Sequence, residues 1–374
     1  MNKEAFRLII KILLVAFFLY LFLVSISLMS VAFKGFGREF AEGLLVSTSN
    51  PFVALFIGIL ATSIVQSSST ITSIVVGMVA SGILSISNAI PIIMGANIGT
   101  TVTNLLVSFG HIVRREEFKK AIAGAAVHDF FNIICVAIMF PLQLTTGFLE
   151  KLATVLSGLF VNCGGIKFTS PLKIITQPAV NIIKHFFVDF LNLSGKAGYI
   201  CVLAVSVLFL FGSLYYIVKL MRSLIIQRSE TILGNIIGKQ GIIGIFIGFI
   251  FTALVQSSSI TTSLLIPLIG AGVLTIEVAF PITMGANVGT TTTAILASFA
   301  TGNPAAITIA FVHFLFNMIG VCLLYPFKIF RQIPIALAKK LGELAYIKRR
   351  YAVIFVLSVF FIIPALLIFI YRLF

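Results

Sequence analysis

The sequence predicts an all-α polytopic membrane protein built from two inverted-topology repeats, and three observations support this fold class. The chain has 374 residues, of which 59% are hydrophobic and only 10% are charged, whereas a globular domain carries about 25% charged residues. Residues 43–113 contain no Asp, Glu, Lys or Arg, and residues 240–327 contain only Glu277. The third observation is that one polar motif occurs twice within these apolar regions, which is typical of membrane proteins with internal structural repeats.

The repeated motif has two parts, each separated from its copy by 190 residues. Val-Gln-Ser-Ser-Ser occurs at 65–69 and 255–259, and Met-Gly-Ala-Asn-x-Gly-Thr-Thr occurs at 94–101 and 284–291. Over the whole stretch, 21 of the 41 residues at 64–104 are identical to those at 254–294. A third part follows at an offset of 185 residues, because His128 and Asn132 match His313 and Asn317. Each half is therefore expected to contain a broken hairpin, an asparagine helix and a His-x-x-x-Asn helix.

The expected spans follow from the lengths of the apolar segments, since about 20 apolar residues cross a bilayer. The predicted spanning helices are 8–33, 86–109, 121–142, 198–218, 277–300, 304–327 and 351–371. The first of these is too long for a signal-peptide core and has no clear cleavage site, so it is interpreted as a retained helix. Segments 50–83 and 241–275 are divided by Gln-Ser-Ser-Ser, and each half is too short to cross alone. Both are interpreted as re-entrant or interrupted helical hairpins.

The distribution of Lys and Arg predicts the orientation. Residues 114–120 form a short basic connection, interpreted as a solvated cytoplasmic loop, whereas the equivalent connection at 301–304 is uncharged and is expected to face outward. Equivalent loops thus lie on opposite sides, which predicts inversion of the repeats. The resulting organisation is a first repeat at 1–142, an extracellular connector at 143–197, a second repeat at 198–327, and a basic interfacial segment with a C-terminal helix at 328–374. The protein is predicted to be a multi-pass protein of the inner (plasma) membrane, with its N-terminus in the cytoplasm.

The duplicated motifs offer uncharged ligands for ions. Broken helices expose backbone N–H groups, and helix N-termini bind anions well, so the two motifs are expected to form a neutral-donor cage for an oxyanion. Ser, Thr and Asn oxygens also coordinate hard cations such as sodium. Small and hydroxyl residues also serve helix packing, but two symmetric copies beside a second polar motif favour a binding site. Together these features indicate a secondary transporter with its site between the repeats.

The residues of the two motifs resemble the type II sodium–phosphate cotransporter family. The resemblance is carried by Gln-Ser-Ser-Ser at 66–69 and 256–259, by the segments 66–76 and 91–100, and by Val-His-Asp-Phe-Phe-Asn at 127–132. It implies sodium-driven symport of inorganic phosphate into the cell by alternating access, in a compact bacterial-like member of the family. It also implies sodium as the only metal and co-substrate, with no transition metal, other cofactor, enzymatic activity or nucleic-acid partner. The oligomeric state and the sodium stoichiometry do not follow from it.

The expected site residues fall into three groups. The phosphate-binding residues are Gln66, Ser67, Ser68, Ser69, Gln256, Ser257, Ser258 and Ser259. The sodium-binding residues are Asn97, Thr100, Gln256, Ser257, Asn287, Thr290 and Thr293. Residues assigned to support or coupling are His128, Asp129, Asn132, His313 and Asn317, and Asp129 has no counterpart in the second repeat, where Phe314 stands.

Two alternatives remain open from the sequence. A proton-coupled anion transporter needs titratable relay groups, for which His128, Asp129 and His313 are the candidates. A membrane sensor that binds phosphate without transporting it is the alternative from a different class.

Overall fold

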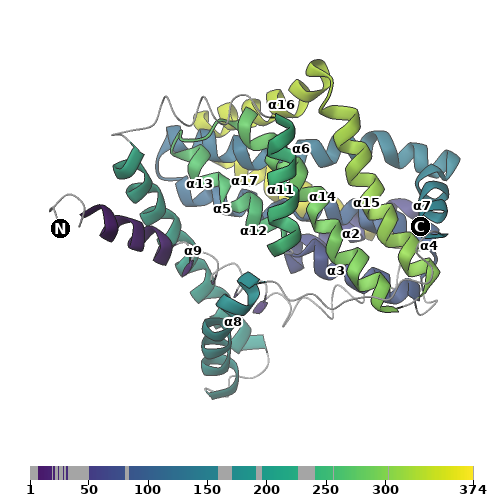
Figure 1. The fold of residues 1–374 in the computed structure, drawn as a ribbon, viewed down its shortest axis with the longest axis horizontal. Coiled ribbons are helices and arrows are strands. Elements are labelled where there is room, and N and C mark those ends of the chain that lie inside the picture. The colour runs from purple at the N-terminus through teal and green to yellow at the C-terminus, as the bar shows by residue number, and fades with distance from the viewer. Residues whose placement is uncertain are drawn as a thin grey trace.

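The structure is a computed structural model that consists of helices and short connections. It describes residues 7–18, 20–21, 24, 28, 31–32, 50–80, 84–158, 171–190, 196–225, 241–255, 257–301 and 303–373. Within these ranges there is no β-strand, as the all-α prediction requires. Most helices gather in one bundle, and α8 and α9 extend away from it (Figure 1).

The first half of the chain supplies the helices that carry the first copy of each motif. They are α2 (Pro51–Val65), α3 (Ser68–Ala80), α4 (Ile86–Gly99), α5 (Val102–Ser108), the short 3-10 helix η1 (Phe109–His111) and α6 (Arg115–Thr146). Residues 143–197, predicted as a connector, are largely helical in their described part. The helices there are α7 (Phe148–Gly158), α8 (Pro171–Lys184) and the π-helix η2 (His185–Phe190).

The second half repeats this series and adds a C-terminal part. Its helices are α9 (Lys196–Ile225), α11 (Gly241–Val255), α12 (Ser258–Ser263), α13 (Leu265–Gly270), α14 (Ile276–Thr301) and α15 (Pro304–Leu324). They are followed by α16 (Lys328–Ile347), α17 (Arg350–Leu357), the π-helix η3 (Ser358–Ile362) and α18 (Ile363–Leu373).

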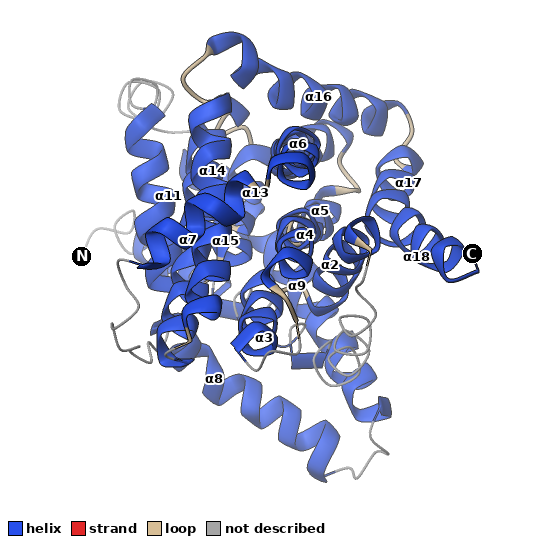
Figure 2. Cartoon of the chain, turned by 90° about the vertical axis from the view of Figure 1, so that its right-hand side faces the viewer, coloured by secondary structure: helices blue, strands red, loops and turns tan. Residues whose placement is uncertain are grey.

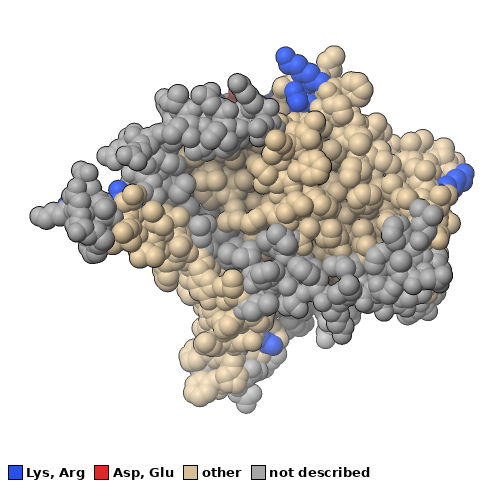
Figure 3. Space-filling view, viewed as in Figure 1, with Lys and Arg blue, Asp and Glu red and all other residues tan. Residues whose placement is uncertain are grey.

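Four helical segments are long and apolar enough to cross a membrane. They are Ile86–His111, Arg115–Thr146, Pro304–Leu324 and Arg350–Tyr371. The residues of the last segment lie mainly on the outside of the bundle, as expected for a helix that faces lipid. On the face in Figure 3, most of the described surface carries no charge, and the Lys and Arg side chains in view lie at its rim. This distribution agrees with a multi-pass membrane protein.

Close helix packing explains the repeated glycines. A Cβ atom on Gly95 would overlap the carbonyl oxygen of Leu55, which brings α4 against α2. A Cβ atom on the equivalent Gly285 would overlap the carbonyl oxygen of Ile245, which brings α14 against α11. Because only glycine permits such close approach of two backbones, both halves contain the same tightly packed helix pair.

One expectation about the loops is wrong. The sequence predicts a solvated loop at 114–120, but α6 begins at Arg115, and Glu117 and Phe118 are buried in its first turns. Two acidic residues in that first turn favour a helix start there, because carboxylates stabilise helix N-termini. The helix then continues to Thr146, and α16 packs across it (Figure 2).

Candidate functional site

Each Gln-Ser-Ser-Ser motif lies at a break between two helices. In the first half, α2 ends at Val65, and Gln66 adopts a left-handed conformation with φ of 54°. Among the described residues, Gln66 is the only non-glycine with positive φ. This conformation ends the helix, because a left-handed residue cannot continue a right-handed one. In the second half, α11 ends at Val255 and α12 begins at Ser258. Gln256, predicted to bind phosphate and sodium, lies outside the described residues.

The first serine of each motif caps the next helix. Ser67 Oγ accepts a hydrogen bond from the backbone N–H of Thr70 at 3.2 Å, and Ser257 Oγ accepts one from Ile260 at 3.3 Å. Serine is among the preferred N-cap residues, because its oxygen satisfies one of the free N–H groups of the first turn. The local sequence therefore explains why a helix restarts at this point in both halves.

The second serine of each motif is buried at the start of that helix. Ser68 is 5% exposed and Ser258 is 2% exposed. Ser69 and Ser259 follow one residue later, in the first turns of α3 and α12. Leu264, between α12 and α13, has right-handed helical dihedrals, so these two segments follow one another almost as one helix. Both motifs thus place hydroxyls and N–H groups at the N-terminal end of a helix.

The asparagine helices bring the two halves into direct contact. Asn287 of α14 accepts a hydrogen bond on Oδ1 from His128 Nε2 at 2.5 Å and donates one from Nδ2 to Asn132 Oδ1 at 2.8 Å. Asn132 in turn donates to the backbone oxygen of Asn97 at 2.9 Å. All these side chains are buried. The second-half asparagine is therefore held by the His-x-x-x-Asn helix of the first half.

The reciprocal contact is less complete. Asn317 donates from Nδ2 to Asn97 Oδ1 at 3.1 Å, but Asn97 Nδ2 donates to the backbone oxygen of Ile93 in its own helix. His313 is buried, and neither of its ring nitrogens has a hydrogen-bond partner. Asn317 Oδ1 is also buried without a partner. The first-half asparagine therefore uses only part of the donors and acceptors that its partner helix offers.

Asp129 of α6 is a buried carboxylate that lies beside this network. Thr101 donates a hydrogen bond to Asp129 Oδ1, and Asp129 Oδ2 has no partner. Asp129 is 0% exposed. A buried carboxylate in a membrane protein is costly unless a positive charge or a proton accompanies it, which favours a functional role.

Asn104 is a site residue that the sequence reasoning missed. Its Oδ1 accepts hydrogen bonds from Thr262 at 2.8 Å and Ser263 at 3.1 Å, and its Nδ2 lies 3.2 Å from His128 Nδ1. Asn104 therefore links the hairpin of the second half to His128. The available signal was its position seven residues after Asn97, which places both on the same helix face. Asn104 is not part of the duplicated motif, because its counterpart in the second half is Ala294.

The predicted threonine ligands occupy two kinds of environment. Thr100 and Thr290 occupy equivalent positions, and each donates its hydroxyl proton at 3.0 Å to the carbonyl oxygen four residues earlier. Their oxygens retain lone pairs that can bind a cation. Thr293 and its equivalent Thr103 have buried hydroxyls without a partner. The Thr293 hydroxyl is therefore more readily available for a ligand than the Thr290 hydroxyl.

The two halves also interlock through their broken hairpins. Helix α3 of the first half packs against α14 and α15 of the second, and α12 and α13 of the second pack against α5 of the first. Ser67 and Ser68 form no hydrogen bond with Ser257, Ser258 or Ser259. The structure thus unites Asn97, Asn132, Asn287, Asn317 and His128 in one network, while each serine motif lies at its own helix break.

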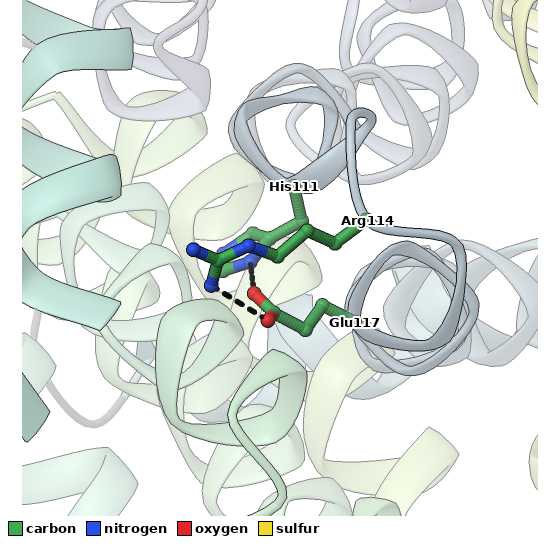
Figure 4. Close-up of polar contacts among 3 residues, drawn as sticks. All are labelled: His111, Arg114 and Glu117. Carbon is green, nitrogen blue, oxygen red and sulfur yellow. Dashed lines mark hydrogen bonds and ion pairs between the residues drawn. The ribbon is translucent and has the colours of Figure 1, made fainter. Parts of the chain in front are cut away.

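A second polar cluster lies at the end of the first asparagine helix (Figure 4). Glu117 accepts a hydrogen bond from Arg114 at 2.9 Å and lies 3.4 Å from His111 Nδ1. A Cβ atom on Gly270 would lie 3.0 Å from the His111 ring, so the end of α13 rests on this cluster. The α5–α6 connection of the first half therefore contacts the hairpin of the second half at this end of the molecule.

Comparison with known proteins agrees with this architecture. Residues 21–170 and 208–337, more than half of the chain, match the family described as Na+/Pi-cotransporter. The chain is 35% identical to sodium-dependent phosphate transport protein 2B of Pongo abelii and of Homo sapiens, over 95% of this chain. It is also 35% identical to sodium-dependent phosphate transport protein 2A of Rattus norvegicus, over 96% of this chain.

The alignment covers a limited part of these relatives. The matched region spans 64% of the 2B proteins and 67% of the 2A protein. No solved structure matches the chain. The names of the family and of its members describe transporters rather than enzymes. With both halves matched and about a third of residues identical along nearly its whole length, the chain belongs to the Na+/Pi-cotransporter family.

Proposed function

We propose that this protein is a secondary transporter that carries inorganic phosphate into the cell together with sodium, by alternating access. The observation that carries the proposal is the pair of equivalent helix breaks, each with a capping serine followed by a buried serine. Membership of the Na+/Pi-cotransporter family and the names of the 2A and 2B relatives support sodium and phosphate as the solutes.

Phosphate is bound by the hydroxyls and helix N-termini of the two motifs. The candidate ligands are Gln66, Ser67, Ser68, Ser69, Gln256, Ser257, Ser258 and Ser259. Ser68 and Ser258 are buried, and no hydrogen bond from any described residue reaches either hydroxyl. Residues 43–113 and 240–327 contain no Lys or Arg, so the anion is stabilised by neutral donors, helix dipoles and cotransported cations.

Sodium is bound by uncharged oxygens, with Asp129 supplying negative charge nearby. The candidate ligands are Asn97, Thr100, Gln256, Ser257, Asn287, Thr290 and Thr293. Oxygen ligands suit hard cations, and the free Oδ2 of Asp129 gives the first half an acceptor that Phe314 cannot provide in the second. The positive charge of sodium offsets the cost of moving phosphate through a site without basic residues.

Alternating access follows from the repeated construction of the two halves, which we propose are inverted repeats at 1–142 and 198–327. In one half Gly95 approaches Leu55 and Gly99 approaches Ile59, and in the other Gly285 approaches Ile245 and Gly289 approaches Phe249. Within each half the two packed helices therefore run in the same direction, and the intervening helix returns as a hairpin. The uncharged 301–304 connection and the basic residues near 114–120 support opposite orientations, with the N-terminus cytoplasmic.

Uptake of radiolabelled phosphate into proteoliposomes tests the proposal. An inward sodium gradient is expected to drive accumulation, and replacement of external sodium by choline is expected to abolish it. Ser206→Ala serves as a control for serine substitution, because that hydroxyl donates only to Leu203 of its own helix. Equal uptake with choline would refute sodium coupling, and phosphate binding without uptake would identify a sensor.

The buried His128, Asp129 and His313 keep a proton-coupled anion transporter as the second candidate. Imposing pH and sodium gradients separately distinguishes the two. Uptake driven by a pH gradient in sodium-free buffer would favour proton coupling.

A further inference from the structure

The two His-x-x-x-Asn helices hold their asparagine partners unequally, although they occupy equivalent places in the two halves. Asn287 uses both amide atoms with the first half, through His128 Nε2 and Asn132 Oδ1. Asn97 receives only one side-chain bond from the second half, from Asn317 Nδ2, and turns its own Nδ2 to Ile93. The atoms equivalent to those that hold Asn287 are a ring nitrogen of His313 and Asn317 Oδ1, and both are buried without partners.

Unpartnered polar atoms in an apolar interior are unfavourable, because they lose their hydrogen bonds to water and gain none in exchange. The first half contains the complementary groups, because Asn97 Oδ1 can accept from a His313 N–H and Asn97 Nδ2 can donate to Asn317 Oδ1. These two bonds would reproduce, in mirrored form, the two that Asn287 already makes. A rotation of the Asn97 amide away from Ile93, with a shift of α15 along α4, would form them; these two helices are already in contact.

We propose that the two Asn–His–Asn triads exchange hydrogen-bonding states when the protein changes the side to which its site opens. In the conformation described here, the triad Asn287–His128–Asn132 is complete and the triad Asn97–His313–Asn317 is partly released. In the opposite conformation the second triad is complete and the first is released. This inference rests on the alternating access proposed above, and it assigns His128 and His313 as positioning residues rather than ligands.

Asn104 biases this exchange toward the present conformation. It donates to His128 Nδ1 and accepts from Thr262 and Ser263, which fixes His128 as the tautomer that donates from Nε2. The second half has Ala294 in the equivalent position and lacks this support for His313. Loss of Asn104 is therefore expected to shift the population in the same direction as loss of the His128 ring nitrogens, but by less.

Spin-label distances measure the exchange without requiring transport. One label replaces Val113, which is 80% exposed beside the His111 cluster, and the other replaces exposed Thr275 after the α13 turn. The full chain is used without its four native cysteines, Cys135, Cys163, Cys201 and Cys322. The pair reports separation of the two halves at the place where Gly270 rests on His111.

His128→Phe is expected to increase the population in which these labels are far apart, because the present conformation loses two hydrogen bonds. His313→Phe is expected to decrease that population or abolish it, because only the other conformation loses bonds. His128→Gln and His313→Gln retain an amide donor and acceptor, and are expected to restore the parent distribution at least in part. Ser206→Ala is the control and is expected to leave the distances unchanged.

The proposal is overturned if both Phe variants shift the distances in the same direction, or if neither shifts them. If a Phe variant does not fold, a Leu variant at that position is measured in its place, and the same change in the label distances is expected. If His313→Phe and His313→Leu both fail to fold while the His128 variants fold, the proposal is also overturned. The reason is that the His313 ring makes no hydrogen bond in this conformation. Failure of sodium-driven uptake would refute the proposed function, whereas the distances test the exchange independently.

Discussion

The two halves of the molecule share one construction but differ in how they distribute charge and hydrogen bonds. Both contain a serine-capped helix break and a glycine-packed helix pair. The first half has a buried carboxylate, Asp129, beside the asparagine network and an amide at position 104, whereas the equivalent positions of the second half hold Phe314 and Ala294. The shared features are therefore those of the helix breaks and their packing, whereas the unshared residues lie around the asparagine network.

Backbone geometry differs between the halves as well. The first asparagine helix is interrupted at Thr100 and Thr101, between α4 and α5, whereas α14 runs continuously from Ile276 to Thr301. Conversely, α3 is regular, and its equivalent has a one-residue irregularity at Leu264, between α12 and α13, although Leu264 keeps right-handed helical dihedrals. Thr101, at the first interruption, is the residue that donates to Asp129. The interruption at Thr100 and Thr101 therefore lies next to Asp129, whose counterpart in the second half is Phe314.

The largest expected effect tests what the halves share. Gly95→Val and Gly285→Val are each expected to prevent folding, because the new side chain would overlap a backbone carbonyl of the neighbouring helix and a backbone cannot yield cheaply. Gly158→Val is the control, because no atom lies within 4 Å of a Cβ atom there. The yield of monodisperse protein and its thermal unfolding midpoint are measured. A normal yield from either variant would show that the close packing is not shared.

The next prediction tests the main difference. Asp129→Ala is expected to raise the sodium concentration for half-maximal uptake more than 100-fold, because removing one charge from a buried pair costs about 3–5 kcal/mol. Phe314→Ala removes the equivalent side chain of the second half and is expected to change the sodium requirement less than about threefold. Sodium titrations of phosphate uptake compare the two. Similar changes in both variants would mean that the halves do not differ in cation binding.

The serine motifs are expected to contribute comparably. Ser68→Ala and Ser258→Ala are each expected to raise the phosphate concentration for half-maximal uptake about 10–100-fold, since a hydrogen bond to a charged group contributes about 1.5–3 kcal/mol. Ser206→Ala is again the control. An effect confined to one motif would show that phosphate is held by one half alone, and unchanged affinity in both would contradict the site.

The smallest effect concerns two equivalent surface positions. Glu277 pairs with Lys339 at 2.6 Å, and its counterpart Ser87 donates to Glu150 at 2.9 Å. Both contacts are exposed, and exposed pairs contribute about 0–1 kcal/mol. Glu277→Gln and Ser87→Ala are therefore expected to shift the unfolding midpoint by no more than a few degrees. Loss of uptake in Glu277→Gln would give this contact between α14 and α16 a role in transport.

Much of the fold was accessible from sequence because apolar length and repeated motifs are local properties. The break at Gln-Ser-Ser-Ser was predicted from the motif, and the helix predicted at 304–327 is found at Pro304–Leu324. The start of α6 at Arg115 was not, because a basic run resembles a loop until its first turn is seen to bury Glu117 and Phe118. Asn104 was not predicted, because it differs from its counterpart Ala294 and so does not belong to the repeated motif.

The sequence by itself determined that the chain crosses a membrane in two related halves, each broken at Gln-Ser-Ser-Ser, because hydrophobic length, helix capping and duplication are written in consecutive residues. Only the tertiary structure decided that each half holds the asparagine of the other, and that it does so unequally. Hydrogen bonds between residues some 155–220 positions apart depend on how helices cross, and neither spacing nor composition records which donor reaches which acceptor.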